Sequence, residues 1–425
     1  MAINPLHSEF CGMQLASPIV LLSGCVGFGE EYTRVEGFSN AAVGAVCLKG
    51  TTGQMRLGNP PHRVCETPDG MLNAIGLQNP GVDTVVDEIL PGLDFDETRF
   101  IANVSGSTVE EYEYVTKRFD DSAIDAIEIN ISCPNVKEGG VAFGNDPEMS
   151  ARVVAACRKH TNKPLITKLS PNQTDIQENA RRCIEAGTDA FAVINTLMGM
   201  AIDAETRKPV IGNRQGGLSG PAIKPIALLK TAQVYEVAKP HHVPIIGQGG
   251  ITCVEDALEF LIAGASAVGI GTALFYDPLV LPRINRGIAA YLDRHGLDSV
   301  TQVTGAGLAV RNTYLQYEAA LRNADASELN LEAELARFEV GASTNFEVVS
   351  AQNQLTQARL SVLQALIGHG KDTEFVDGAK TVLDRAYHTV AFTRVAFEVE
   401  YGIDHVLEDP GAGQCAFLGD VSDEE

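Results

Sequence analysis

Residues 126–145 read AIEINISCPNVKEGGVAFGN, and this stretch decides the fold. Its first six residues, Ala126 to Ile131, are apolar and rich in Ile, which predicts a short strand buried on both faces, as in a parallel sheet. Asn130, Cys133 and Asn135 fall at or just past the C-terminal end of that strand. Parallel α/β proteins place their chemistry at this end, so the stretch predicts an α/β protein with a polar site there.

The thiol of Cys133 stands between two amide side chains and precedes a Lys-Glu-Gly-Gly loop. This arrangement suits proton abstraction from a planar polar substrate, because the amides can orient a ring while the sulfur reaches a C–H group. A single Cys is as often a packing residue in a buried strand. Cys133 alone therefore leaves both interpretations open.

Similar short apolar runs recur along the chain, separated by helix-like stretches. Including 126–132, they predict eight strands, at 19–22, 45–49, 100–105, 126–132, 164–169, 190–195, 243–247 and 267–272. Eight alternations of strand and helix predict a (β/α)₈ TIM barrel, and residues 6–17 before the first strand predict a small hairpin that closes its floor. A doubly wound sheet is the alternative, but its G-x-G-x-x-G signature is missing after the first strand.

Polar or glycine residues follow each predicted strand, as a catalytic rim requires. Gly249-Gly250 and Gly271-Thr272 end the last two strands, where backbone N–H groups at helix starts commonly bind phosphate. Lys168 ends an otherwise apolar strand and so requires either a buried negative partner or a reducible cofactor that gains charge, such as a flavin. Each feature taken singly has a structural explanation, as a turn glycine or a snorkelling lysine.

Composition narrows the class of protein. The chain has 425 residues and a formal net charge of −23, which disfavours nucleic acid and anionic membranes as partners. Its nine cysteines form no C-x-x-C pair, so we expect no metal site and free thiols in a reducing compartment. No apolar run is long enough to cross a bilayer and no signal segment is evident, so we expect a cytoplasmic protein.

Eight ordered motifs carry a family resemblance. They are SGCVGFG (23–29), LKGTTGQMRLGNPPHRVCETPDGMLNAIGLQNPG (48–81), EINISCPNVKEGGVAFG (128–144), ITKLSPN (166–172), VINT (193–196), GGLSGPAIKP (216–225), IIGQGGI (245–251) and IGTALF (270–275). On these motifs, residues 3–305 resemble the class 1B dihydroorotate dehydrogenases, whose catalytic subunit oxidises dihydroorotate to orotate on FMN in pyrimidine biosynthesis.

The resemblance implies a role for each matching residue. Cys133 is expected to be the base that removes the substrate's C5 proton while hydride passes to the flavin. The residues expected to bind orotate are Lys49, Asn73, Ala74, Ile75, Gly76, Leu77, Asn130, Asn195 and Thr196. Those expected to bind FMN are Ser23, Lys49, Gly50, Asn103, Asn130, Lys168, Ile194 and Gly220, with the phosphate at Gly249, Gly250, Gly271 and Thr272.

The resemblance also implies a partner. Class 1B enzymes pass electrons to NAD through a second subunit that carries FAD and a 2Fe–2S cluster, and a homodimer of catalytic subunits forms the core of a heterotetramer. Three alternatives remain: a fumarate-dependent class 1A enzyme, a related FMN-dependent pyrimidine oxidoreductase, and a scaffold whose barrel is catalytically idle.

The sequence changes character after the barrel. Residues 306–368 contain two long segments, 310–340 and 346–367, with apolar residues at three- and four-residue steps, which predicts a helical hairpin. The string RFEVGASTNFEVVSAQNQLTQARLSVLQAL resembles the periplasmic hairpin of outer-membrane efflux factors. Three interpretations remain open: an oligomerisation or docking hairpin, an inactive remnant of gene fusion, and an efflux component, the last disfavoured without a signal segment. Residues 369–425 are unassigned and end in an acidic tail.

Overall fold

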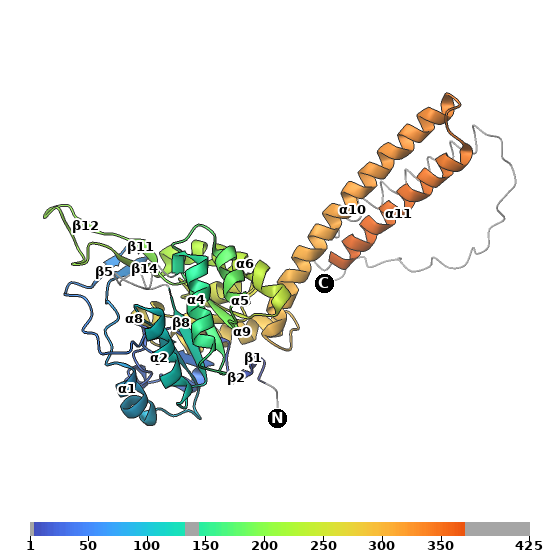
Figure 1. Cartoon of the computed structure of the whole chain (residues 1–425). Coiled ribbons are helices and arrows are strands. Elements are labelled where there is room, and N and C mark those ends of the chain that lie inside the picture. Colours follow the sequence, from blue (N-terminus) through green and yellow to red (C-terminus); the bar gives the residue numbers. More distant parts are fainter. Residues whose placement is uncertain (1–3, 132–143, 370–425) are drawn as a thin grey trace. The chain divides into compact units, whose positions relative to one another are not determined.

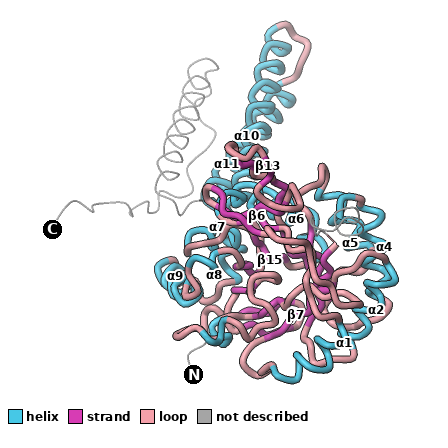
Figure 2. Tube along the Cα trace, turned by 90° about the vertical axis from the view of Figure 1, so that its left-hand side faces the viewer, coloured by secondary structure: helices cyan, strands magenta, loops and turns pink. Residues whose placement is uncertain are grey.

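The computed structural model describes residues 4–131 and 144–369. The first of its two compact units contains a closed barrel of eight parallel strands (Figures 1 and 2). The barrel strands are β3 (Ile19–Leu21), β4 (Ala45–Cys47), β7 (Arg99–Val104), β8 (Ala126–Asn130), β9 (Leu165–Leu169), β10 (Ala190–Val193), β15 (Ile245–Gln248) and β16 (Ala267–Ile270). Each pairs with its neighbours in chain order, and β16 closes the ring on β3. All eight predicted strands are present, so the predicted (β/α)₈ barrel is confirmed.

Strands β8 and β9 are buried along their whole length, as their apolar sequences predict. Their register places Asn130 beside Lys168 at the C-terminal end of the pair. Glu128 lies two residues before Asn130 on β8 and therefore projects on the same side of the strand, one layer deeper. A charged residue at that depth is unusual, because burying an ion without a partner is costly.

The barrel floor is covered by the predicted N-terminal hairpin, β1 (Ser8–Phe10) and β2 (Met13–Leu15). Phe10, Met13 and Leu15 form one buried cluster with residues of all eight barrel strands, such as Ile166 and Ile246. The opposite end of the barrel is therefore the end left for ligands.

Helices cover the outside of the barrel. They are α1 (Val82–Thr84), α2 (Val109–Asp120), α4 (Pro147–Arg158), α5 (Ile176–Glu185), α6 (Lys224–Ala238), α7 (Val254–Ile262), α8 (Ala273–Tyr276) and α9 (Val280–Arg294). Side-chain caps begin α2, α4 and α5, at Thr108, Asp146 and Asp175 respectively. The crossover from β3 to β4 is made instead by two 3₁₀ turns, η1 (Tyr32–Arg34) and η2 (Asn40–Ala42).

The two long insertions of the sequence meet at the C-terminal end of the barrel. They form a four-stranded antiparallel sheet in the order β11 (Leu197–Gly199), β14 (Gly216–Ser219), β6 (Gly70–Asn73) and β5 (Val64–Thr67), with a separate pair β12 (Ile202–Asp203) and β13 (Lys208–Pro209). In Figure 1, β5, β11 and β14 lie together at one end of the barrel. The insertion after β4 thus pairs directly with the insertion after β10.

The chain divides into two compact units, residues 1–308 and 309–425. Helices α10 (Thr301–Glu339) and α11 (Asn345–His369) form the predicted hairpin, but α10 begins nine residues earlier than the predicted 310. Its first turn belongs to the barrel unit, because Val303 is buried and the Thr304 hydroxyl donates to the carbonyls of Leu261 and Ala265 at 3.2 and 3.1 Å.

The turn between the two long helices has the predicted capping box. The Thr344 backbone N–H donates to Glu347 at 2.7 Å, and the Glu347 N–H donates back to the Thr344 hydroxyl at 3.3 Å. The buried residues of α11 are Val348, Ala351, Leu355, Ala358 and Val362, spaced as one helix face. In the described part of the chain, neither helix of this hairpin nor any other is apolar enough over a sufficient length to cross a membrane.

Candidate active site

A cavity of about 460 Å³ opens at the C-terminal ends of the barrel strands. Its walls come from the strand ends and from the sheet of the two insertions, so segments distant in sequence share it. The predicted site residues that border it are Ser23, Lys49, Gly50, Asn73, Ile75, Gly76, Leu77, Asn130, Lys168, Ile194, Asn195, Thr196, Gly220, Gly249, Gly250, Gly271 and Thr272. One cavity therefore collects nearly all of them.

Three predicted residues need separate mention. Ala74 and Asn103 are described but are not among the residues that border the cavity. Asn103 lies directly behind the wall, where its side-chain oxygen accepts a hydrogen bond from Asn130 at 3.4 Å. Cys133 lies outside the described residues, so its role as base stays a prediction.

Amide side chains form a connected row on one wall. Asn195 donates to the side-chain oxygen of Asn130 at 3.3 Å, and Asn130 donates in turn to Asn103. Asn73 reaches the same cavity from β6, and its amide donates to the carbonyl of Gly217 at 3.3 Å. Because each amide donates through its nitrogen, these bonds fix which way each group faces and suit recognition of a planar ring with carbonyl and N–H edges.

Lys168 stands in this wall with only 5% of its surface exposed. Its ammonium lies 3.5 Å from the carboxylate of Glu128 on the neighbouring strand. Burial alone would lower the pKa of Lys168, but Glu128 and, more weakly, the thiols of Cys47 and Cys25 raise it above its usual value. Of the two partners that the sequence left open for this lysine, the negative side chain is thus present.

Glycines shape the corner where the last two strands end. Gly249 and Gly250 both have positive φ, 130° and 85°, which favours residues without a Cβ. A Cβ on Gly250 would lie 2.8 Å from the carbonyl oxygen of Gly220, so side chains are excluded there. Beside them, Gln248 is 1% exposed and borders the cavity, and its side-chain oxygen finds no hydrogen-bond donor in the described structure. An acceptor left in this state indicates a ligand with a hydrogen-bond donor.

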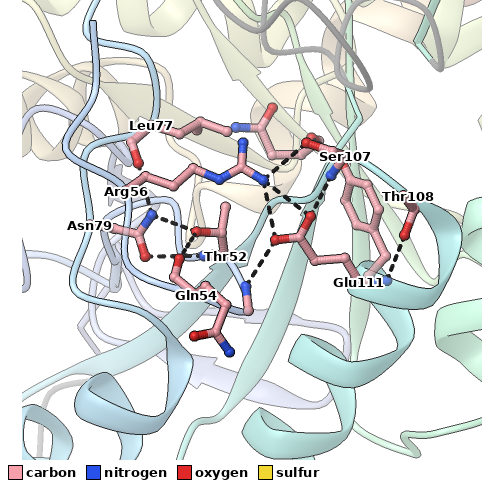
Figure 3. Close-up of polar contacts among 11 residues, drawn as sticks. Thr52, Gln54, Arg56, Leu77, Asn79, Ser107, Thr108 and Glu111 are labelled. Carbon is pink, nitrogen blue, oxygen red and sulfur yellow. Dashed lines mark hydrogen bonds and ion pairs between the residues drawn. The ribbon is translucent and has the colours of Figure 1, made fainter.

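The insertion after β4 is held in place by two clamps, both shown in Figure 3. In the first, the buried Asn79 side chain accepts from the N–H groups of Thr52 and Gly81, and donates to the Thr52 hydroxyl and to the Leu77 carbonyl, both at 2.8 Å. Leu77 itself borders the cavity and has a positive φ of 56°, which a non-glycine residue adopts only when its surroundings impose it. Asn79 supplies part of that constraint.

The second clamp joins the same insertion to helix α2. The carboxylate of Glu111 accepts from the backbone N–H groups of Gly53 at 3.1 Å and Ser107 at 2.7 Å, and it pairs with Arg56 at 3.1 Å. Arg56 also forms an isolated β-bridge with Asn79, which connects the two clamps. Together they hold the insertion around Gly53, Arg56 and Leu77, and Leu77 borders the cavity.

Sequence reasoning missed Glu128, Gln248 and Asn79. For Glu128 a signal was available, because an acidic residue inside an apolar strand requires a buried cation, and Lys168 was already recognised as a buried cation. Gln248 lies within the GQGG turn, where the glycines alone indicate a phosphate site. Asn79 lies within the motif at 48–81, but its partners at Thr52 and Leu77 follow only from the folded loop.

Comparison with known proteins agrees with this geometry. The sequence model of the family described as dihydroorotate dehydrogenase matches residues 5–292. The chain belongs to the dihydroorotate dehydrogenase family. Among its relatives are proteins named dihydroorotate dehydrogenase B (NAD(+)), catalytic subunit. The one from Anoxybacillus flavithermus is 51% identical over 304 residues, 71% of this chain and 96% of its own, and the one from Enterococcus faecalis is 48% identical over 305 residues, again 71% and 96%.

The family match at residues 5–292 covers the barrel and ends before the hairpin. A third relative of the same name, from Oceanobacillus iheyensis, is 50% identical over 299 residues, which is 70% of this chain and 97% of the relative. These relatives are therefore matched almost in full, and this dihydroorotate dehydrogenase homologue is longer than they are by a C-terminal segment. The resemblance of that segment to efflux factors stays a prediction.

Proposed function

We propose that this chain is the catalytic subunit of a dihydroorotate dehydrogenase, which oxidises dihydroorotate to orotate in pyrimidine biosynthesis with FMN as hydride acceptor. Family membership and the names of the relatives support this. The observation that carries the proposal is the shared cavity, in which a row of oriented amides, a buried lysine and a side-chain-free glycine corner face one space. Such a space suits a planar substrate beside a phosphorylated flavin.

The residues present fit FMN. The glycine corner at Gly249 and Gly250 leaves room for a phosphate against backbone N–H groups, and the unpaired acceptor on Gln248 suits a ribityl hydroxyl as donor. The ammonium of Lys168 suits the N1–C2=O edge of the flavin ring, where negative charge develops on reduction. When bound, FMN supplies an acceptor for the hydride of the substrate.

The chain's own residues then bind and orient the substrate. Asn73, Asn130 and Asn195 present amides to the polar edges of the dihydroorotate ring, while Lys49 attracts its carboxylate. Cys133 serves as the base that takes the C5 proton, in keeping with the family motif. The segment 73–77, of which all residues but Ala74 border the cavity, would cover the ring and exclude water.

A partner subunit completes the reaction. The name of the relatives, catalytic subunit of an NAD(+)-dependent enzyme, supports a separate electron-transfer subunit. We assign FAD and a 2Fe–2S cluster to that partner, a homodimer of this chain to the core of a heterotetramer, and the cytoplasm to the assembly. Residues 1–305 are the catalytic barrel, 306–368 an oligomerisation or docking hairpin, and 369–425 an acidic tail.

The test uses the purified full-length chain. It should show flavin absorbance, and anaerobic dihydroorotate should bleach that absorbance with formation of orotate. It should reduce an artificial dye but not NAD(+), because NAD(+) reduction requires the partner. A colourless protein that binds no added FMN refutes the proposal, robust NAD(+) reduction by the chain alone refutes the partner, and fumarate reduction as fast as dye reduction indicates the class 1A alternative.

A further inference from the structure

A carboxylate lies buried beneath the cavity, one layer below the residues that border it. Glu128 is 1% exposed, and its Oε1 accepts hydrogen bonds from Asn103 Nδ2 at 2.5 Å and from Cys47 Sγ at 3.5 Å. The same oxygen lies 3.5 Å from Lys168 Nζ. Three other barrel strands, β4, β7 and β9, thus each direct one donor at this single acid.

Of these donors only Lys168 borders the cavity. The lysine therefore lies between the ligand space and Glu128, and any group that touches its ammonium is one side chain away from the carboxylate. A buried pair of this kind is weak evidence for a role in stability, because desolvation cancels much of its attraction. Its position beside a ligand cavity calls for a functional explanation.

Among the described charged and titratable groups around Lys168, Glu128 is the counter-ion. Cys47 and Cys25 also face the lysine. Burial raises the pKa of Cys25 to about 11, although Lys168 and Lys49 act to lower it. Burial likewise raises the pKa of Cys47 well above its usual value. Both thiols are therefore protonated and uncharged near neutral pH. Lys49, which faces Cys25, is a cation and cannot stabilise the charge on Lys168.

We propose that Glu128 is a positioning residue of the flavin site that keeps Lys168 protonated in both oxidation states of the flavin, so that reduction takes up one proton only. This inference rests on the proposed function, in which Lys168 contacts FMN. Two electrons and one proton, delivered together as the hydride of dihydroorotate, convert oxidised flavin to its anionic reduced form. The permanent ammonium then balances the new negative charge without a further proton.

Removal of the Glu128 carboxylate changes the number of protons that are taken up when the flavin is reduced. In Glu128→Gln the amide still accepts the hydrogen bond from Asn103, but the counter-ion is gone and desolvation lowers the pKa of Lys168. The lysine is then neutral beside oxidised flavin above its lowered pKa. Because the reduced flavin restores a negative charge beside it, Lys168 takes a second proton from solvent on reduction.

The experiment measures the midpoint potential of the FMN-loaded full chain against pH, by dithionite titration with reference dyes, from about pH 7.5 to 9. The wild type should show the slope of one proton per two electrons, and Glu128→Gln should show twice that slope. A variant that binds FMN stoichiometrically and keeps the wild-type slope overturns the proposal. Wild-type protein that binds no FMN would instead refute the proposed function.

Two variants serve as controls. Cys47→Ala removes another partner of the same carboxylate but leaves the ion pair, so its slope should equal that of the wild type. Glu128→Gln combined with Lys168→Arg replaces the lysine by a side chain that stays protonated, so the slope should return to one proton. A doubled slope in either control contradicts the assignment to Lys168.

A second readout needs no flavin. A lysine whose folded pKa is lowered binds fewer protons in the folded than in the unfolded state, so its contribution to stability increases with pH. The wild-type pKa is raised, so over the same range its stability is not increased by deprotonation of Lys168. The difference in Tm between wild type and Glu128→Gln, both without FMN, should therefore shrink from pH 7 to pH 9. A constant difference, or a variant unfolded at both pH values, overturns the proposal in favour of a purely structural role.

Discussion

Replacement of Asn79 by Ala tests how the loop beside the cavity is held. Asn79 is 4% exposed, and its side chain makes four hydrogen bonds, to the N–H groups of Thr52 and Gly81, the Thr52 hydroxyl and the Leu77 carbonyl. All four partners lie within residues 52–81, so the loss should appear as local opening of this segment before global unfolding. The barrel strands keep their own hydrogen bonds.

The magnitude follows from those bonds. Each is worth about 1 kcal/mol net, and some partners regain water or alternative bonds when Asn79 is truncated, which leaves a loss of about 2 to 3 kcal/mol. Amides that exchange only when the segment opens should then exchange roughly 30- to 150-fold faster. The informative amides are those of Arg56, which donates to the Asn79 carbonyl at 2.9 Å, and Asn59, which donates to the Ile75 carbonyl at 2.9 Å.

Hydrogen exchange measured by mass spectrometry on the full chain supplies the assay. Asn213→Ala is the matched control, because Asn213 is only half-buried and its side-chain amide makes just a 3.5 Å contact with the Gln215 carbonyl. Orotate should slow exchange of the same segment in the wild type, since residues 73–77 are proposed to cover it. Exchange at Arg56 and Asn59 within about threefold of the wild-type rate in Asn79→Ala would refute the clamp.

Three further predictions concern the reaction and the domain boundary. Cys133→Ser should keep FMN and bind orotate yet lose turnover at neutral pH by about two orders of magnitude or more, because a hydroxyl is a much weaker base than a thiol; unchanged kcat would remove Cys133 from the mechanism. Lys168→Ala should bind FMN more weakly, and it leaves the Glu128 carboxylate without its cation. The Tm of this variant should therefore be lower than that of the double variant Glu128→Gln/Lys168→Ala. Equal Tm values would contradict the ion pair. A chain ending at Thr304 should bind FMN and turn over like the full chain, because it keeps the buried Val300 and Val303; a flavin-free or insoluble product would show that the hairpin belongs to the barrel core.

The barrel could be predicted because each of its strands has a recognisable local sequence pattern. Runs such as residues 126–130 and 165–169 are short, rich in Ile and Leu and buried along their whole length, which is the pattern of a strand covered on both faces. The start of α10 could not be predicted in the same way, although its end at Glu339 agrees with the predicted 340. Gly305 and Gly307 lower the local helix propensity, so the pattern predicts a helix from 310, whereas the helix begins at Thr301 within the barrel unit.

The site was predictable to the extent that strand ends determine it. Asn130, Lys168 and Asn195 could be placed at one rim because the C-terminal ends of parallel strands meet there. The clamps on the insertion after β4 could not be predicted in this way. Glu111 accepts from the backbone of Gly53, 58 positions away, and Asn79 donates to the Thr52 hydroxyl, 27 positions away. No periodicity in the sequence indicates either contact.

Lys168 is buried between an acidic side chain and the cavity. A buried lysine requires a negative partner, and from the sequence a flavin and an acidic side chain satisfy that requirement equally well. Because Glu128 provides the acid, the burial of Lys168 no longer argues for a cofactor by itself. A cofactor is indicated instead by the position of Lys168, which borders the cavity while Glu128 lies behind it. A lysine needed only to neutralise Glu128 would be better covered by apolar side chains, so its contact with a ligand space implies a second, intermittent negative charge on the other side.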